Sequence, residues 1–327
     1  MTEQDPRTIA GQVLQPGTRT EMELRPAKLP SGGWMSIPVV AVHGAAPGPT
    51  MWLSAAIHGD EICGVEIIRQ ILASITPKDF AGTLLAVPIV NVPGFATGDR
   101  YMPDRRDLNR SFPGSKRGSL ASRFAHAFMT EIVQHCDVGI DLHTGSDHRR
   151  NVPQIRADLS DDPTAELTEV FAAPYALHSR LRDGSLREAA CRSGATTLLY
   201  EAGEAWRFDR DAIEVGVRGV RRVLAHLQMT DPAGGEPPVL PTVVLGPSSW
   251  ARSPQSGLAR LAVDLGDHVT ERQPIGVVAD AIGNSERTVR ATRSGIVIGR
   301  NESPVVHRGD ALVHIGAHPT TETGATP

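Results

Sequence analysis

Cysteine is scarce in this chain of 327 residues. The three cysteines, Cys63, Cys136 and Cys191, are an odd number and show no Cys-x-x-Cys spacing. A disulfide framework normally needs an even set, and a cysteine-based zinc site needs closely spaced pairs. The pattern therefore argues against both and indicates a reducing compartment.

Long apolar runs and a basic leader are also missing. No run of about 18 apolar residues occurs, as a transmembrane helix would require. The first five residues, MTEQD, are polar and acidic, where a secretory signal would be basic and then apolar. We therefore expect a soluble, cytoplasmic protein without a membrane partner.

The chain lacks a strong charge of either sign and is very poor in lysine. Its 33 Lys and Arg against 37 Asp and Glu leave a net charge of -4, with no long run of one sign. This balance argues against nucleic acid as a partner. Lysine occurs only at Lys28, Lys78 and Lys116, so arginine supplies 30 of the 33 basic residues.

The chain length allows two domains, at roughly 150 residues each. From residue 51 to about 225, short apolar runs alternate with amphipathic stretches. The runs predict strands at 51–57, 84–90, 138–142 and 196–200, and the amphipathic stretches predict helices at 62–74 and 120–135. Apolar strands separated by helices indicate an α/β domain, here residues 1–230, with a largely parallel sheet covered on both faces. We expect residues 1–50 to form short strands and turns.

The pattern changes after residue 230. Residues 231–238, DPAGGEPP, have the composition of a linker. Short β-like runs separated by glycine turns follow and predict an all-β domain over 239–317. Residues 318–327 have no apolar content to bury, so we expect a disordered tail.

Two histidines and a glutamate stand at predicted strand ends. His58 and Glu61 lie at the turn between the first strand and its helix, and His143 ends the strand at 138–142. Carboxyl ends of parallel strands meet at one edge of a sheet. Two histidines and one glutamate are a ligand set of catalytic zinc, which leaves a fourth position for water. The alternatives to a metal site are histidines that merely lie in loops, as we expect for His43, and a glutamate that is present because the helix dipole favours a carboxylate at this position.

Residues 91–114 form a long segment rich in glycine, proline and arginine. Loops of this length within a domain are commonly functional. Arg100 and Arg110, with Asn109 beside them, could grip a carboxylate through a bidentate fork. The alternative is a solvated basic loop, which we favour for Arg105 and Arg106.

Glu201 directly follows the predicted strand at 196–200. Near a metal, its carboxylate could take a proton from bound water. Glu204 is the competitor, although it better suits the start of a helix over 205–210.

Four motifs occur in order: HGDE (58–61), RY with DLNRSFPG (100–101 and 107–114), DLHTG (141–145) and TLLYEAG (197–203). Together they resemble the succinylglutamate desuccinylase/aspartoacylase family, relatives of the zinc metallocarboxypeptidases. The resemblance covers about residues 40–230 closely and the C-terminal β domain more loosely. It implies a zinc-carboxypeptidase-like α/β fold, a mixed, largely parallel sheet flanked by helices, with a C-terminal barrel-sandwich-like β domain.

The resemblance also implies the roles of individual residues. One Zn²⁺ per chain would be held by His58, Glu61 and His143. Glu201 would act as general base and then acid, and Arg100 would polarise the scissile carbonyl. The clamp on the substrate carboxylate would be formed by Asn109 and Arg110.

The implied activity is zinc-dependent amide hydrolysis, which removes an acyl group from an N-acylated amino acid or a similar small carboxylate. The alternative is a metallocarboxypeptidase that cleaves a C-terminal or side-chain-linked amino acid from a peptide. A non-catalytic binding protein of the same fold is disfavoured by the intact motif residues. A homo-oligomer is possible, but no surface pattern identifies its interface.

The resemblance leaves the roles of some residues in the site undecided. The segment between Tyr101 and Asp107 is slightly longer than in aspartoacylase, which leaves the acyl-side contacts open. A second substrate-binding arginine is either Arg187, which we prefer, or Arg192. Asp141 points to the same side of its strand as His143, and either orients a metal ligand or has a capping role.

The C-terminal region resembles the fold of biotinyl and lipoyl carriers. The last lysine of the chain is Lys116, so no residue there can carry a biotinyl or lipoyl arm. In relatives a C-terminal β domain stands over the active-site mouth and restricts substrate size. We adopt this role as a hypothesis for residues 239–317.

Overall fold

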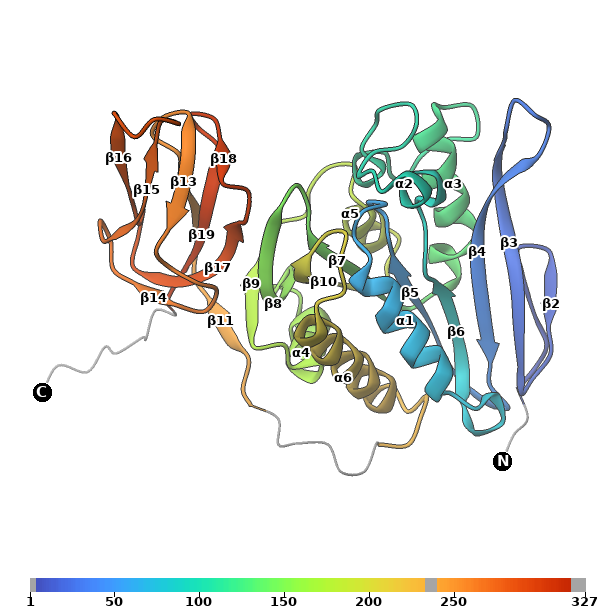
Figure 1. The fold of residues 1–327 in the computed structure, drawn as a ribbon. Coiled ribbons are helices and arrows are strands. Elements are labelled where there is room, and N and C mark those ends of the chain that lie inside the picture. Colours follow the sequence, from blue (N-terminus) through green and yellow to red (C-terminus); the bar gives the residue numbers. More distant parts are fainter. Residues whose placement is uncertain (1–3, 233–239, 319–327) are drawn as a thin grey trace, which may run out of the picture.

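One sheet runs through the molecule, from the N-terminal strands to the C-terminal β region (Figure 1). The computed structural model describes residues 4–232 and 240–318. In order across the sheet, the strands are β12 (Ser248–Arg252), β19 (Ala311–Ala317), β17 (Gly295–Asn301), β8 (Arg149–Ala157), β10 (Thr196–Glu204), β7 (Val138–Gly145), β5 (Ala46–Ala55), β6 (Ala81–Val87), β4 (Trp34–His43) and β3 (Thr18–Lys28).

The centre of this sheet is parallel and its flanks are mostly antiparallel. β6, β5, β7 and β10 pair in parallel, and these are the four strands expected from the apolar runs. β4 joins β6, and β8 joins β10, in the antiparallel sense. Every residue of β7 is buried, as expected for a strand covered on both faces. The mixed α/β fold is confirmed.

Helices cover both faces of the central sheet. α1 (Cys63–Ser74), α4 (Asp162–Phe171) and α6 (Arg210–His226) pack over one face in one apolar core. α3 (Leu120–Glu131) and α5 (Leu186–Arg192) pack in a second core on the other face. The predicted helix at 120–135 ends earlier than expected, and a 3₁₀ turn (Val133–His135) follows it.

The N-terminal 50 residues are more regular than expected. Short strands β1 (Arg7–Ile9) and β2 (Gln12–Leu14) precede a long antiparallel pair formed by β3 and β4. Buried Met22 and Leu24 alternate with exposed charged residues along β3. This two-residue period marks a strand with one face on the core, so the expectation of only short strands was wrong.

The segment at 91–114 also holds regular structure. It contains the six-residue helix α2 (Val92–Thr97) and a 3₁₀ turn (Leu108–Arg110). The Asn91 side chain caps α2 by accepting from Gly94 N at 2.9 Å, and Gly98 is the C-cap of the helix. Six residues are too few for an apolar period to reveal a helix from sequence.

The C-terminal region consists of strands in its described part, residues 240–318. Besides β12, β17 and β19 it holds β11 (Val243–Leu245), β13 (Gly257–Leu261), β14 (His268–Val269), β15 (Pro274–Ala279), β16 (Glu286–Arg290) and β18 (Val305–Val306). It has a core of its own. Even so, β17 pairs with β8, and β11 pairs with β9 (Tyr175–His178).

The predicted linker and tail fall mainly outside the described residues. Of the linker at 231–238, residues 233–238 are not described, and of the tail at 318–327 only His318 is described. Within the described ranges, no helix is both long and apolar enough to cross a membrane.

Candidate metal centre and substrate cavity

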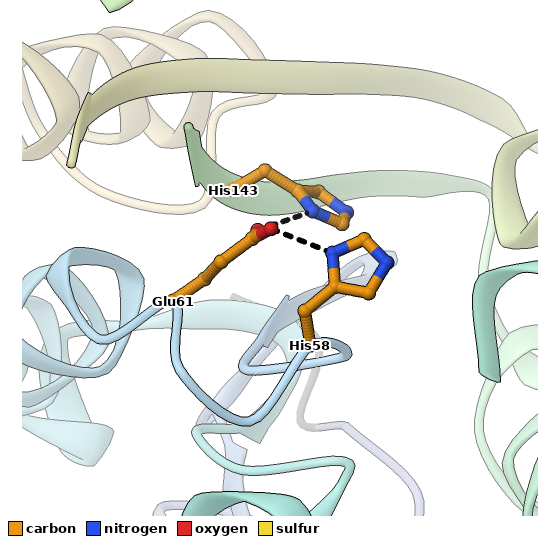
Figure 2. A group of neighbouring side chains, drawn as sticks. All are labelled: His58, Glu61 and His143. Carbon is orange, nitrogen blue, oxygen red and sulfur yellow. Dashed lines mark hydrogen bonds and ion pairs between the residues drawn. The ribbon is translucent and has the colours of Figure 1, made fainter. Parts of the chain in front are cut away.

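His58, Glu61 and His143 converge at the carboxyl end of the central strands (Figure 2). His58 follows β5, Glu61 precedes α1, and His143 lies on β7, which is the parallel neighbour of β5. All three side chains are buried, and one ligand atom from each lies within 4.8 Å of the others. Glu61 Oε1 is 2.7 Å from His58 Nδ1, and Oε2 is 2.7 Å from His143 Nδ1.

An aspartate holds the remote nitrogen of each histidine. His58 Nε2 is 3.2 Å from Asp107 Oδ1, and His143 Nε2 is 2.7 Å from Asp141 Oδ2. Metal-binding histidines commonly donate their second ring N–H to a carboxylate, which fixes the nitrogen that faces the metal. Here both Nδ1 atoms face Glu61, so the donor set fits a catalytic zinc site with three protein ligands.

Asp107 was not recognised as a site residue from the sequence. It begins the DLNRSFPG motif, in which Asn109 and Arg110 drew attention instead. Its position in that motif is the one sequence signal that could have identified it. Asp141, by contrast, contacts His143, as expected if it orients a metal ligand, which is the first of its two predicted roles. Its Oδ1 accepts a hydrogen bond from Ser54 Oγ at 2.8 Å.

The electrostatics of this cluster are strongly coupled. Burial would lower the pKa of His143, but the carboxylates of Asp141 and Glu61 raise it well above its usual value. Burial would raise the pKa of Glu61, but the two histidines hold it well below its usual range. The pKa of Asp107 is likewise lowered against the effect of burial, by its hydrogen bond to His58. Glu61 and Asp107 are therefore charged carboxylates near neutral pH, and they accept hydrogen bonds.

Asp60, the third residue of the HGDE motif, is buried beside this cluster. Neither of its carboxylate oxygens has a hydrogen-bond partner among the described residues. Burial, and then the charge of Glu61, raise the pKa of Asp60 to about 6. Its backbone carbonyl accepts from Trp206 N at 2.9 Å, which ties the motif to the segment after β10.

Arg100 reaches the same cluster from the segment at 91–114. Its Nη1 is 3.4 Å from Glu61 Oε1, and its Nη2 donates to Asp107 Oδ2 at 3.1 Å. Ser146, which the sequence did not single out, accepts from Arg100 and donates to Glu61. The guanidinium is mostly buried and lies at the edge of the candidate metal centre.

Glu201 lies on β10, where it is paired in register with His143 of β7. Its Oε1 accepts from Asn151 Nδ2 at 2.8 Å, and its Oε2 lies 3.2 Å from Arg156 Nε. Glu201 lines the cavity in front of the metal centre, whereas Glu204 lines a separate pocket and pairs with Arg207 at 3.5 Å. The structure therefore places Glu201, not Glu204, beside the candidate ligands.

A cavity of about 800 Å³ opens in front of the metal centre. Asn109, Arg110 and Arg187 all line it. Asn109 Oδ1 accepts from the backbone N–H of Leu186 at 2.8 Å, so the segment at 91–114 is bound to the start of α5. Burial and then the charge of Arg182, another lining residue, lower the pKa of Arg110.

The structure separates the two candidates for a second substrate-binding arginine. Arg187 is buried, lines the cavity, and donates to the carbonyls of Ser179 and Arg180, both at 2.9 Å. Arg192 has a side chain that is 74% exposed and pairs with Glu188 outside the cavity. Of the two arginines, Arg187 alone lines the cavity.

The loop arginines outside the site lie as expected. Arg105 and Arg106 do not line the cavity, and the Arg106 side chain is 64% exposed. His43 also lies outside the site, but the expectation of a loop histidine was wrong: it is the buried last residue of β4, with Nδ1 2.9 Å from Thr83 Oγ1. The C-terminal region contributes part of the cavity wall, including Trp250, Arg252 and Asp310.

Comparison with known proteins agrees with this arrangement. The sequence profile of the succinylglutamate desuccinylase/aspartoacylase catalytic domain matches residues 47–227. The chain belongs to the succinylglutamate desuccinylase/aspartoacylase family. The match spans all the motif residues discussed above.

Two relatives carry deacylase names, and a solved structure with a similar fold is named an ectoine utilization protein. The N-alpha-acetyl-L-2,4-diaminobutyric acid deacetylase of Halomonas elongata is 30% identical over 298 residues, 86% of each chain. The succinylglutamate desuccinylase of Burkholderia cenocepacia is 28% identical over 225 residues, 61% of this chain and 62% of the relative. The product-bound structure of the ectoine utilization protein EutE (DoeB) from Ruegeria pomeroyi matches with a TM-score of 0.85 and 26% identity, covering 97% of this chain and 100% of that one.

Proposed function

We propose that the chain is a zinc-dependent amide hydrolase that removes an acyl group from an N-acylated amino acid or a similar small carboxylate. The observation that carries the proposal is the convergence of the His58, Glu61 and His143 donor atoms beside Glu201 in one cavity. Zinc held by these three ligands would lower the pKa of a bound water and polarise a carbonyl group.

The protein groups around the ligands supply the proton transfers and the charge stabilisation. The Glu201 carboxylate takes a proton from the attacking water and delivers it to the nitrogen of the leaving amine. As the amide bond breaks, the acyl group leaves as a carboxylic acid and the amino acid as a free amine. Arg100 donates hydrogen bonds to the carbonyl oxygen while negative charge develops on it.

The cavity favours a substrate that carries a carboxylate. Eight arginines and five carboxylates line it, so its walls are positive before any metal is bound. Asn109, Arg110 and Arg187 are the groups we assign to the substrate carboxylate, because the planar guanidinium fork matches a carboxylate in two-point contact. The substrate named for the Halomonas relative combines a carboxylic acid with an acetyl amide.

The rival activity is that of a metallocarboxypeptidase, which would use the same metal and the same glutamate. A substrate panel separates the two: N-acetyl amino acids, including Nα-acetyl-L-2,4-diaminobutyrate, N-succinyl amino acids, and short peptides with free C-termini. We expect turnover of N-acyl amino acids and little cleavage of peptides.

We also place the protein in the cytoplasm, since its three cysteines are free thiols.

The test combines metal analysis with a substitution at the proposed base. We expect about one zinc per purified chain, and we expect Glu201→Gln to lower kcat by about 10²–10⁴-fold, the range for loss of a general base, while keeping the metal. Glu204→Gln is the matched control, because Glu204 ends the same strand outside the cavity. A Glu201→Gln protein as active as the wild type, or a metal-free active enzyme, would refute the mechanism.

A further inference from the structure

The carboxylate of Glu201 is held at both oxygens by one neighbouring strand. Asn151 Nδ2 donates to Oε1 at 2.8 Å, and Arg156 pairs with Oε2 at 3.2 Å. Both residues belong to β8, the antiparallel neighbour of β10. The position of the proposed base therefore depends on where β8 places these two side chains.

Strand β8 lies between the catalytic sheet and the C-terminal β region. Along β8, Asn151 pairs with Gly203 of β10 on one side and with Gly299 of β17 on the other. The ladder between β10 and β8 is irregular between Glu201 and Gly203, next to the base. Asn151 thus stands where the two parts of the molecule join.

The orientation of the Asn151 amide follows from its partners. A carboxylate only accepts hydrogen bonds, so the amide nitrogen must be the atom that faces Glu201. The amide oxygen Oδ1 is buried and has no hydrogen-bond partner among the described residues. Packing, not a hydrogen bond, must therefore hold this end of the side chain.

Gly299 supplies that packing surface. A Cβ atom added at Gly299 would lie 2.6 Å from Asn151 Oδ1 and 3.2 Å from His314 Cβ. The first distance is below any normal contact, so a larger residue at 299 would displace the Asn151 amide. Because Gly299 has no side chain, the Asn151 Oδ1 can occupy this space while its Nδ2 donates to Glu201.

We propose that β17 of the C-terminal region is part of the catalytic centre, with Gly299 and Asn151 as positioning residues for the Glu201 carboxylate. The inference rests on the proposed function, in which Glu201 is the general base. The C-terminal region then has a second contribution besides its share of the cavity wall: it fixes the geometry of proton transfer.

The test is a double-mutant cycle on the zinc-loaded enzyme. We expect Gly299→Ala and Asn151→Ala each to lower kcat by about tenfold or more, since displacements of about 1 Å at a reacting group can cost 100-fold. KM should change by less than about twofold, because we assign the substrate carboxylate to Asn109, Arg110 and Arg187. Adding Gly299→Ala to Asn151→Ala should cause no further loss, because the first acts through the second.

Gly246→Ala is the matched control in the same β region. The three atoms nearest to a Cβ at Gly246 would be Ala317 Cβ at 3.3 Å and two backbone oxygens at 3.5 and 3.9 Å, none of them in the site, so kcat should not change. Unchanged kcat in a folded Gly299→Ala enzyme, or losses that multiply in the double variant, would overturn the proposal. If Gly299→Ala does not fold, an unchanged kcat in the Asn151→Ala enzyme is sufficient to overturn the proposal. Failure of the proposed function is recognised separately, by an active Glu201→Gln enzyme.

Discussion

At the scale of single residues, the two candidate metal histidines are fixed by carboxylates on the side away from the metal. Asp141 holds His143 at 2.7 Å, and Asp107 holds His58 at 3.2 Å. Each aspartate selects the tautomer that leaves Nδ1 free as a ligand. The ligand geometry is therefore set by two residues that do not themselves face Glu61.

We predict that Asp141→Asn and Asp107→Asn each weaken zinc binding by about 10–100-fold, the usual effect of losing such a partner. An asparagine retains the shape but loses the charge that supports the imidazole. Competition against a zinc-selective chelator measures the affinity. Asp147→Asn is the control, since Asp147 lines the cavity with a largely exposed side chain and contacts neither histidine. Equal affinities in all three variants would contradict the assignment.

The sequence predicted the residues at strand ends better than those that support them. His58, His143 and Glu201 each follow an apolar run, so their meeting at one sheet edge could be inferred from local pattern alone. Asp107 and Asn151 could not be found in this way. Their partners, His58 and Glu201, are 49 and 50 residues away in the chain, and only the folded arrangement brings them together.

At the scale of elements, the paired strands β5 and β7 pack tightly against each other at one point. Trp52 of β5 is fully buried, and its ring lies over Gly139 of β7. A Cβ added at Gly139 would lie 2.0 Å from the Trp52 ring. The paired register, Trp52 opposite Gly139, places His143 four residues further along β7, at the carboxyl end.

Gly139→Ala should destabilise the protein by about 3 kcal/mol, the upper end of the range for overpacking, because neither a rigid indole nor a central strand can move aside easily. Urea unfolding followed by circular dichroism measures the loss. Gly33→Ala is the control, since a Cβ there would meet only flexible side-chain atoms at 3.8 Å or more. A change of less than about 0.5 kcal/mol, the usual size for surface sites, would show that the sheet accommodates the methyl group.

Some elements of the fold can be predicted from a short stretch of sequence, whereas others depend on residues far apart in the chain. The four central strands were found because continuous apolar runs are typical of strands buried on both faces. The long β3–β4 pair was missed, although Met22 and Leu24 alternate with charged neighbours. The pairing of β17 with β8 carries no sequence signal, because it joins residues nearly 150 positions apart.

At the scale of the whole molecule, the C-terminal region is joined to the catalytic part through the sheet itself. β17 continues the sheet beyond β8, and the region contributes Trp250, Arg252 and Asp310 to the cavity wall. From the sequence we expected the fold of biotinyl and lipoyl carriers here, but the chain holds no lysine after Lys116. The arrangement suits a fixed wall rather than a swinging arm.

Trp250 is the largest side chain that this region presents to the cavity. Its ring stacks on His314, with centroids 4.6 Å apart and planes 7° from parallel. The guanidinium of Arg149, which lies on β8, is 5.8 Å from the centre of the Trp250 ring. The stack holds the indole in place at the cavity wall, where it would limit the size of a substrate that reaches it.

We therefore predict that Trp250→Ala raises kcat/KM for N-acyl amino acids with longer acyl chains, relative to the acetyl compounds, by about tenfold, the scale on which pockets discriminate a methylene. Competition between acetyl and longer-chain substrates measures this ratio directly. Trp34→Ala is the matched control, since Trp34 is 45% exposed at the start of β4 and does not line the cavity. An unchanged ratio in a folded Trp250→Ala enzyme would mean that the acyl chain points away from the C-terminal wall, and the size limit would then lie with the segment at 91–114.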